Sequence, residues 1–455
     1  MSDQEYLMKK LPVSAIVGAV FIAVLVFSLV ACDPISLKQT IDNLVLGWTR
    51  AVTLTSPENE SEIAEKTPLL DWEDAGGATG YQVQISESES FDGITPIDIE
   101  EAVSEYEIPE PLIIGNTRYW RVRAVNGETA SEEWSEAYSF SIIPSSAPEL
   151  VNTLTIGEKA WGITTDGEYL YSSAGVNGLK MFDISDPASP VLTDTFPTAN
   201  GIWGIDVVGD YAYASESIGS ADYYVYLLDV SEPTNIVEID SHTYSNQMYG
   251  LKYAGICLFV GLFDGYYRFD SIPPNLDGTP DFEDPGAGER VNSFAQTGGY
   301  LVYTVDNMGI EILRLNGNTV VGSASAKALD VTDPPAFSNS MVTIYGNYAY
   351  VTTMDCSFIE IFNLENISSP ESVATYDLPT AGNNISVIDH FAFVSVFDGS
   401  IRILDLSSPT APELIGTIPS ETAEITVHTV AGNYLYGTNF ATGELFVVDL
   451  VPEGE

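Results

Sequence analysis

Apolar and polar residues alternate in short stretches along most of the chain after residue 50. Tyr81–Ile85 and Tyr119–Val125 show the two-residue period of a strand that is buried on one face. Clusters rich in Gly, Pro, Asn and Asp separate such stretches, and these residue types favour tight turns. The pattern predicts an all-β protein built from many short strands.

A repeated phrase organises the chain from residue 148 onwards. It consists of a Gly followed by two aromatic residues at alternate positions, and an apolar run that usually ends in Asp comes after it. Successive copies begin 42–47 residues apart, which is the period of a four-stranded propeller blade. Seven copies predict a seven-bladed β-propeller over 148–455. The copies begin at Gly167, Gly209, Gly255, Gly299, Gly346, Asp389 and Gly432.

The last copy of the repeat is incomplete at its end. A further phrase, Pro-x-Leu-x-x-Thr, follows the Asp run in several copies, as in Pro190–Thr195, but is missing after Asp449. A matching segment stands before the first copy, at 148–155. We therefore expect 148–155 to form the outer strand of the last blade, beside Leu445–Asp449. Closure of this kind removes an unpaired edge and couples the two ends of a repeat array.

The apolar runs carry a second signature. Met181–Pro190, Leu227–Pro233 and Ile403–Pro409 share the order Asp, apolar residue, Ser and later Pro. These segments resemble the LVIVD repeat family of exported bacterial and archaeal propellers. The resemblance is strong in copies one, two, five, six and seven, and it lapses in copies three and four. It implies the propeller fold and adds little about function.

A smaller domain is expected ahead of the repeats, at 51–143. Trp72 and Trp120 would supply the large buried surfaces that a small β-sandwich needs. The Trp on the second strand, the alternating strand 81–85 and the segment 112–122 resemble the fibronectin type III pattern. The resemblance implies a spacer or docking domain. The sequence has no Arg-Gly-Asp tripeptide, so nothing argues for integrin-type adhesion.

The N-terminus has the features of an export signal. Two Lys residues precede an apolar run over 11–31, and the run leads directly to Cys32. The Leu-Val-Ala-Cys end of the run resembles the lipobox of bacterial lipoproteins. It implies that 1–31 is a signal peptide, that Cys32 carries the lipid, that 32–50 is a spacer, and that the protein is anchored to the cell envelope, periplasmic or at the surface. An uncleaved anchor is the alternative, because the run is nearly long enough to span a bilayer.

Charge narrows the range of partners. The chain has 65 acidic and 16 basic residues, which gives a formal net charge of −49 at pH 7. Nucleic acid and anionic lipid headgroups would both be repelled, so we expect no nucleic-acid partner. The acidic residues are scattered, which favours a role in solubility or in a salty habitat over screening by divalent cations. Three Cys residues do not make a disulfide scaffold.

Blade geometry places candidate binding residues at one rim of the propeller channel. A position at the entry to each innermost strand lies six residues before the turn Gly or Asp389. It is aromatic in the first three blades, at Trp161, Trp203 and Tyr249, each followed by Gly, and polar in the other four. Facing aromatic and polar arcs would suit a carbohydrate or a peptide side chain, unless the aromatics fill the channel or pack under a loop. The polar positions are Ser293, Ser340, Asn383 and Thr426.

Two sets of residues are candidate cation ligands, because hard cations prefer oxygen. One Asp occupies the loop between the second and third strands of each of four neighbouring blades, although an Asp there more often forms the turn itself. An insertion in the third blade has the spacing of thrombospondin type 3 calcium loops, with Pro273 in place of the first acid, so Ca²⁺ is the one cofactor considered. The two sets are Asp264, Asp306, Asp355 and Asp398, and Asn275, Asp277, Asp281 and Asp284.

No catalytic motif is found. The three His residues share no motif, and His-Glu-x-x-His, Gly-x-Ser-x-Gly and paired Cys spacings are missing from the sequence. We expect a non-catalytic protein that binds a protein or glycan at the propeller rim. The alternatives are a carbohydrate-active enzyme that uses rim carboxylates, and an envelope component without a soluble ligand.

Overall fold

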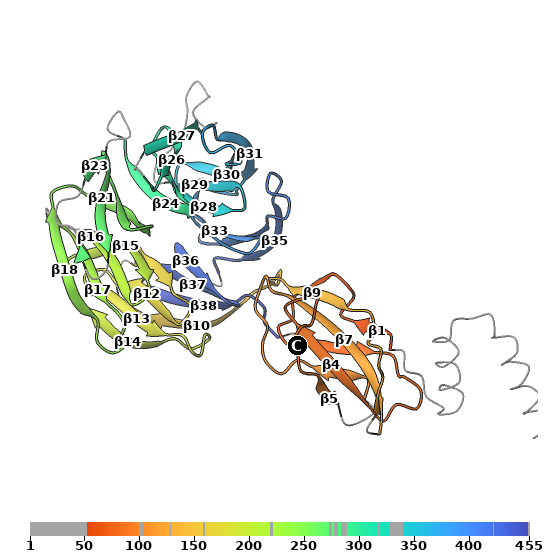
Figure 1. Cartoon of the computed structure of the whole chain (residues 1–455). Coiled ribbons are helices and arrows are strands. Elements are labelled where there is room, and N and C mark those ends of the chain that lie inside the picture. Colours follow the sequence, from red (N-terminus) through yellow and green to blue (C-terminus); the bar gives the residue numbers. More distant parts are fainter. Residues whose placement is uncertain are drawn as a thin grey trace, which may run out of the picture. The chain divides into compact units, whose positions relative to one another are not determined.

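The computed structural model describes residues 52–99, 103–127, 129–157, 160–218, 222–272, 275–276, 281–283, 289–316, 319–326, 340–421 and 423–453. These residues form two compact units (Figure 1). The smaller unit is built around 67–110 and 117–141, and the larger around 142–455 together with 62–66 and 111–116. Within the described ranges no helix has the length and apolar character needed to cross a membrane. Cys32 and the predicted signal peptide lie outside these ranges.

The smaller unit contains two antiparallel sheets. One has the order β1-β3-β6, and the other has the order β2-β9-β7-β4-β5 with β8 paired to β7. The strands are β1 (Leu54–Ser56), β2 (Ser61–Ile63), β3 (Leu69–Trp72), β4 (Gly80–Ser86), β5 (Ile97–Ile99), β6 (Glu105–Glu107), β7 (Thr117–Asn126), β8 (Thr129–Ala130) and β9 (Tyr138–Ile142).

Buried aromatic rings hold these two sheets together. Trp72 on β3 meets Tyr81 on β4 edge to face, with ring centroids 5.2 Å apart. Trp120 and Val122 on β7 are completely buried, and Arg121 between them is partly exposed, as the alternating pattern predicts. Trp72 and Trp120 therefore supply the core of the smaller unit, in agreement with the sequence prediction.

The larger unit consists of antiparallel sheets that follow one another along the chain, each a meander of neighbouring strands. The third sheet differs because β22 and β23 both pair with β21. In chain order the strands are β11 (Ile163–Thr165), β12 (Tyr169–Ser173), β13 (Leu179–Asp183), β14 (Val191–Phe196); β15 (Gly201–Val208), β16 (Tyr211–Ile218), β17 (Tyr223–Asp229), β18 (Val237–Tyr244); β19 (Met248–Ala254), β20 (Cys257–Leu262), β21 (Gly265–Ile272), β22 (Asn275–Leu276), β23 (Asp281–Glu283); β24 (Val291–Thr297), β25 (Tyr300–Val305), β26 (Gly309–Arg314), β27 (Thr319–Ser325); β28 (Met341–Tyr345), β29 (Tyr348–Thr353), β30 (Cys356–Asn363), β31 (Glu371–Asp377); β32 (Gly382–Ile388), β33 (Phe391–Val396), β34 (Ile401–Asp405), β35 (Glu413–Ile418).

The last sheet combines strands from both ends of the larger unit. Its order is β10-β38-β37-β36, with β10 (Glu149–Thr155), β36 (Val427–Ala431), β37 (Tyr434–Asn439) and β38 (Glu444–Asp449). Leu150 pairs with Val448 and Thr153 with Phe446. This is the pairing that the register of the repeats predicts for the closing strand.

The first strands of the sheets form a ring. β11, β15, β19, β24, β28, β32 and β36 each lie against the next, and β36 lies against β11. Leu170 and Phe182 of the first sheet pack in one cluster with Tyr436 and Leu445 of the last. Figure 1 shows the inner strands β15, β24, β28 and β36 towards the middle of this unit, and β14, β18, β31 and β35 at its periphery.

The repeated phrases explain how neighbouring sheets are joined. The second aromatic residue of the phrase is buried in the second strand of its sheet, as at Tyr350 and Tyr436. The Tyr350 hydroxyl donates to the carbonyl of Pro409, 3.2 Å away, and the Tyr436 hydroxyl donates to the carbonyl of Pro187 at 3.0 Å. Both prolines belong to the Asp-x-Ser-x-Pro corner of the next sheet in the ring. The two phrases are therefore parts of one contact between sheets.

The Asp of this corner has a structural role. The Asp183 carboxylate accepts a hydrogen bond from the Ser185 backbone N–H at 2.7 Å, and Asp229 accepts from Ser231 in the same way at 2.9 Å. The hydrogen bond from Ser185 lowers the pKa of Asp183 by stabilising its charged form. Such bonds are typical of an Asx-turn, which turns the chain out of the third strand.

An extra residue interrupts the pairing of the outermost strand in most of these sheets. In the first sheet, the adjacent residues Met181 and Phe182 pair with Asp194 and Leu192, so the backbone of Thr193 is skipped in the pairing with β13, and its hydroxyl donates to the Met181 carbonyl at 3.0 Å. A bulge of this kind bends a strand and increases its twist. The unpaired residues are Val151, Thr193, Ile239, Val321, Val373 and Ile415.

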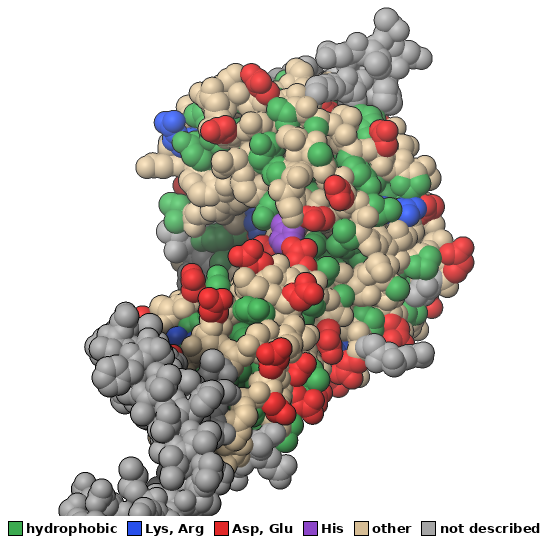
Figure 2. All heavy atoms as spheres, turned by 90° about the vertical axis from the view of Figure 1, so that its right-hand side faces the viewer, with side chains coloured by type: hydrophobic (Ala, Val, Ile, Leu, Met, Phe, Trp, Pro, Cys, Tyr) green, Lys and Arg blue, Asp and Glu red, His purple; other side chains and the backbone are tan. Residues whose placement is uncertain are grey.

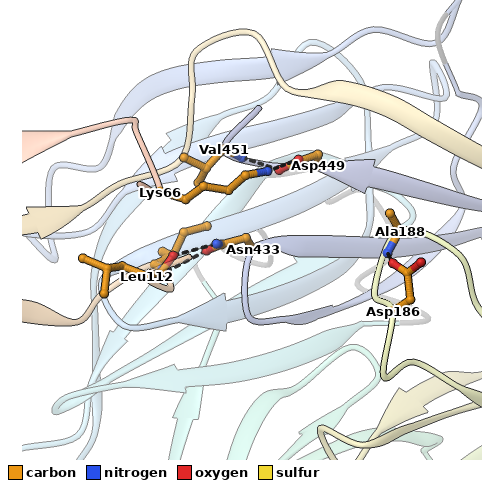
Figure 3. Close-up of polar contacts among 8 residues, drawn as sticks. Lys66, Leu112, Asp186, Ala188, Asn433, Asp449 and Val451 are labelled. Atoms are coloured by element: carbon orange, nitrogen blue, oxygen red, sulfur yellow. Dashed lines mark hydrogen bonds and ion pairs between the residues drawn. The ribbon is translucent and has the colours of Figure 1, made fainter. Parts of the chain in front are cut away.

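Two segments from earlier in the chain are fixed to the last sheet of the larger unit (Figure 3). Lys66 forms an ion pair with Asp449. The Asn433 side chain donates to the Leu112 carbonyl at 2.7 Å and accepts from the Ile114 backbone N–H at 2.9 Å. The contacts account for the assignment of 62–66 and 111–116 to this unit.

Candidate functional site

A stack of aromatic rings marks the entry to the first two inner strands. Trp161 precedes β11 and Trp203 lies on β15, and their rings are parallel within 10° with centroids 4.8 Å apart. Phe440, in the turn between β37 and β38, stacks with Trp161 at 4.8 Å. Tyr249 on β19 meets Trp203 edge to face at 5.7 Å. We call Phe440, Trp161 and Trp203 the aromatic stack.

Backbone contacts hold the stack in place. The Ser173 hydroxyl accepts hydrogen bonds from the backbone N–H groups of Trp161 and Gly162, at 2.7 and 2.9 Å. A Cβ atom at Gly162 would lie 2.6 Å from the Trp203 carbonyl oxygen. β11 and β15 therefore approach too closely for a side chain at Gly162, so a Gly is required directly after Trp161.

A cavity of about 190 Å³ lies beside the stack. Its wall joins Trp161 and Trp203 to Asn383 and Thr426, so the structure brings together four of the predicted rim positions. Asn383 donates through Nδ2 to the Thr426 carbonyl at 2.7 Å, which fixes the polar side of the wall. We call this space the rim cavity. The remaining lining residues are Met341, Met354, Asn384, Phe397, Val427 and Phe440.

Tyr249 belongs to a neighbouring group centred on Arg290. The Arg290 guanidinium lies 4.7 Å from the Tyr249 ring centroid and 5.3 Å from that of Phe263. Its Nε atom is 3.6 Å from a carboxylate oxygen of Asp306. Asp306 also accepts from the Asn292 amide at 2.5 Å. Tyr249 and Asp306, both predicted as ligand-binding residues, therefore contact Arg290 instead of lining the rim cavity.

Large apolar residues occupy the turns between the second and third strands. Phe263 is 57% exposed, Phe397 55%, Val176 62% and Phe440 37%. Met354 occupies the equivalent turn between β29 and β30 and lines the rim cavity. We call these five residues the apolar rim. Three of them, Met354, Phe397 and Phe440, come together around the rim cavity, and exposed apolar groups that lie together mark interaction sites.

Two of the four predicted loop carboxylates, Asp306 and Asp398, are held by nearby donors. Asp398 accepts hydrogen bonds from the Ser400 backbone and hydroxyl and lies 3.4 Å from Arg402. Burial opposes ionisation of Asp398, but these donors outweigh it and lower its pKa. Asp264 and Asp355 lie in separate turns. Among the described residues, no group of three or more His, Cys, Asp or Glu side chains could hold a metal ion.

The predicted calcium loop contains strands in its described part. Asn275 lies on β22 and Asp281 on β23, and both strands pair with β21. The Asp281 carboxylate forms an ion pair with Arg268 on β21. Asp277 and Asp284 lie outside the described residues, so the cation site stays a prediction, and Asp281 contacts a basic side chain in the described part.

No His or Cys of the described ranges is among the residues that line the rim cavity. His428 on β36 is 3% exposed, and its Nε2 atom lies 3.0 Å from the Phe393 carbonyl oxygen. Burial lowers the pKa of His428 to about 4, so the ring is neutral at pH 7. Cys257 and Cys356 are buried free thiols. Burial raises the pKa of Cys356 to about 11, which makes it a poor nucleophile.

Sequence reasoning missed Arg290, Phe440 and the apolar rim. A signal for the rim was present, because Phe263, Met354 and Phe397 each directly precede a predicted loop Asp. This pairing of a large apolar residue with Asp recurs at one point of the repeat. Nothing in the sequence around Arg290 sets it apart.

Comparison with solved structures identifies the fold class. The β-propeller domain of Cps50 (Swd1) from Myceliophteria thermophila is 14% identical, with a TM-score of 0.53, and the match covers 67% of this chain and 99% of that one. A second solved structure, BamB from Moraxella catarrhalis, is 14% identical with a TM-score of 0.46, and the match covers 66% of this chain and 85% of BamB. The first likeness shows a β-propeller-like fold and nothing about activity.

The chain carries LVIVD repeats. The LVIVD repeat model matches 157–198, 202–243, 338–377 and 381–419. These are four of the five copies in which the resemblance was expected to be strong, and the two copies in which it lapses are not matched. No curated protein matches the chain.

Proposed function

We propose that this protein is an exported, lipid-anchored component of a bacterial cell envelope whose seven-bladed β-propeller is a non-catalytic binding module. A propeller with LVIVD repeats suits a binding or scaffold role. One blade for each sheet of the larger unit gives seven blades. The smaller unit is a fibronectin type III-like domain that serves as a stalk, supported by its two sheets and its buried Trp72.

The anchor is proposed from the sequence alone. The apolar run over 11–31 ends at Cys32, the residue that a lipobox would acylate. Substitution of Cys32→Ser should abolish incorporation of labelled fatty acid and release the protein from membranes. Membrane retention of the unlabelled variant would instead support an uncleaved transmembrane anchor.

The rim cavity carries the binding proposal. Three aromatic rings from three separate sheets stack beside a cavity whose lining also includes Asn383 and Thr426. Apolar surfaces with a few placed polar groups are typical of ligand sites. The ligand class is a protein or a glycan, and a net charge of −49 argues against nucleic acid.

The acidic surface fits this choice. Figure 2 shows one face of the molecule, on which Asp and Glu side chains are spread widely and Lys and Arg are sparse. The predicted rim carboxylates are engaged locally at Asp306 and Asp398, which argues against their use as a catalytic pair. We therefore propose binding without turnover.

The test combines arrays with an activity assay. Full-length protein would be applied to glycan and peptide arrays and incubated with the same glycans to detect hydrolysis. We expect binding that is lost in Trp203→Ala, with no turnover. Hydrolysis that disappears in Asp355→Asn or Asp398→Asn would overturn the proposal in favour of a carbohydrate-active enzyme. Binding unaffected by Trp203→Ala would place the site elsewhere.

A further inference from the structure

We infer that the propeller rim recognises a protein segment that combines positive charge with a large apolar side chain. This inference rests on the proposed binding function and narrows its ligand. It is built from three observations: the exposed apolar rim, the way in which the aromatic stack is packed, and the charges beside the rim.

The apolar rim provides the contact area. Phe397 and Phe263 expose more than half of their surfaces, and Phe440 exposes 37%. Phe397, Met354 and Phe440 also border the rim cavity, which at about 190 Å³ has room for one large side chain. Flexible Met and rigid aromatic side chains around a small cavity are typical of surfaces that bind proteins through one anchoring residue.

The packing of the stack favours a protein over a glycan. A sugar ring binds by lying flat on an exposed aromatic face. Trp161 already stacks with both Phe440 and Trp203, and Trp203 has Tyr249 against it as well. The indole faces are therefore engaged within the protein. The rim cavity is lined instead mainly by apolar side chains, together with Asn383, Asn384 and Thr426.

The charges beside the rim favour a basic partner. Asp264, Asp355 and Asp398 directly follow the apolar residues Phe263, Met354 and Phe397, so carboxylates and apolar groups alternate around the rim. Two guanidinium groups lie beside this set, and each is next to a carboxylate: Arg290 lies 3.6 Å from Asp306 and Arg402 lies 3.4 Å from Asp398. The four loop carboxylates, Asp264, Asp306, Asp355 and Asp398, therefore outnumber the basic groups beside them. A segment with Lys or Arg on either side of an apolar anchor would complement this order of charges and apolar groups.

The test uses the full-length chain in detergent and a panel of short synthetic peptides. The peptides combine positive, zero or negative net charge with a central Phe or a central Gly, and neutral oligosaccharides form a second panel. Dissociation constants would be measured at low and high salt. We expect the tightest binding for the basic peptides that contain Phe, weakening as salt screens the charges.

Matched variants locate the contact. Phe397→Ser should weaken binding of the basic Phe peptide by about tenfold or more. The control Leu414→Ser removes an apolar residue of similar exposure, 52% against 55%, from the outer strand of the same sheet, and should have little effect. The double variant Asp355→Asn with Asp398→Asn should weaken binding, whereas Glu371→Gln with Glu413→Gln, which removes the same charge from two outer strands, should not.

The outcomes separate this inference from the proposed function. Oligosaccharide binding that requires Phe397, or equal binding of basic and acidic peptides, would overturn the inference and leave a binding rim. If no peptide or oligosaccharide showed binding that depends on Phe397, both the inference and the proposed binding function would be overturned. Loss of binding in Leu414→Ser to the same extent as in Phe397→Ser would also reject the rim as the contact.

Discussion

The Nζ atom of Lys66 lies 2.7 Å from a carboxylate oxygen of Asp449, and the two side chains are only 10% and 7% exposed. The other carboxylate oxygen accepts from the Val451 backbone N–H at 2.9 Å (Figure 3). Residues that are 383 positions apart in sequence thus form one buried ion pair at the end of the closing sheet.

Breaking this pair should destabilise the protein. Lys66→Met leaves the Asp449 carboxylate buried without its counter-charge, so we expect a loss of about 3 kcal/mol in the free energy of unfolding. Urea denaturation followed by tryptophan fluorescence measures it. The double variant Lys66→Met with Asp449→Leu should recover much of the loss, because no buried charge remains. A single variant as stable as the parent would contradict this account.

The closing strand should stabilise the whole ring. Leu154 on β10 packs against the cluster that joins the first and last sheets. Leu154→Asp places a charge there, and we expect a loss of about 3 kcal/mol that lowers the thermal unfolding of all sheets together. Calorimetry and hydrogen exchange would follow it. Val151→Asp, at a 41% exposed position of the same strand, is the control and should be nearly neutral. Fraying confined to the last sheet would show that closure does not couple the ring.

The close approach at Gly162 gives a third prediction. An added methyl would meet the Trp203 carbonyl at 2.6 Å, so Gly162→Ala must separate β11 from β15. We expect a loss of about 2 kcal/mol and a weaker exciton signal from the Trp161–Trp203 pair in circular dichroism. Gly299→Ala is the control, because a Cβ atom there meets nothing within 4 Å. An unchanged exciton signal in Gly162→Ala would mean that the stack does not depend on this contact.

Burial of His428 should make stability depend on pH. The folded pKa is about 4 against an ordinary value of 6.5, so between these values the unfolded chain binds a proton that the folded protein does not. Stability is therefore highest above pH 6.5 and falls as the pH drops towards 4. The full loss in the free energy of unfolding amounts to about 3 kcal/mol. His428→Gln removes this titration, and its stability should fall less over that range. Parallel curves for the variant and its parent would exclude the effect.

The parts of the fold that could be predicted are those set by local pattern. Alternation over Tyr81–Ile85 predicts the strand β4 and the burial of Tyr81 and Val83, although Gln84 is buried and Ile85 only partly so. The pairing of Leu150 with β38 followed from register, because a missing phrase at one end matched an extra one at the other. Trp161 and Trp203 could be placed at one rim because each stands at a fixed position in the repeat.

The parts that could not be predicted depend on side chains from different repeats. Arg290 contacts Tyr249 and Asp306, and the direction in which its side chain points does not follow from the spacing of residues in the repeat. Asp281 was a candidate cation ligand by spacing, but β23 pairs with β21 and brings it to Arg268. Spacing records distance along the chain, whereas these contacts depend on how separate strands meet.

The extra residue in the outermost strands affects how readily two molecules of this protein can aggregate. At Thr193 and its equivalents, the free hydrogen-bonding groups on either side of the bulge fall out of phase with each other. An extended strand from another molecule could therefore form only a few backbone hydrogen bonds with the outermost strand before the two strands lose register. Molecules at high local concentration should therefore resist pairing through their outermost strands and should not form fibres.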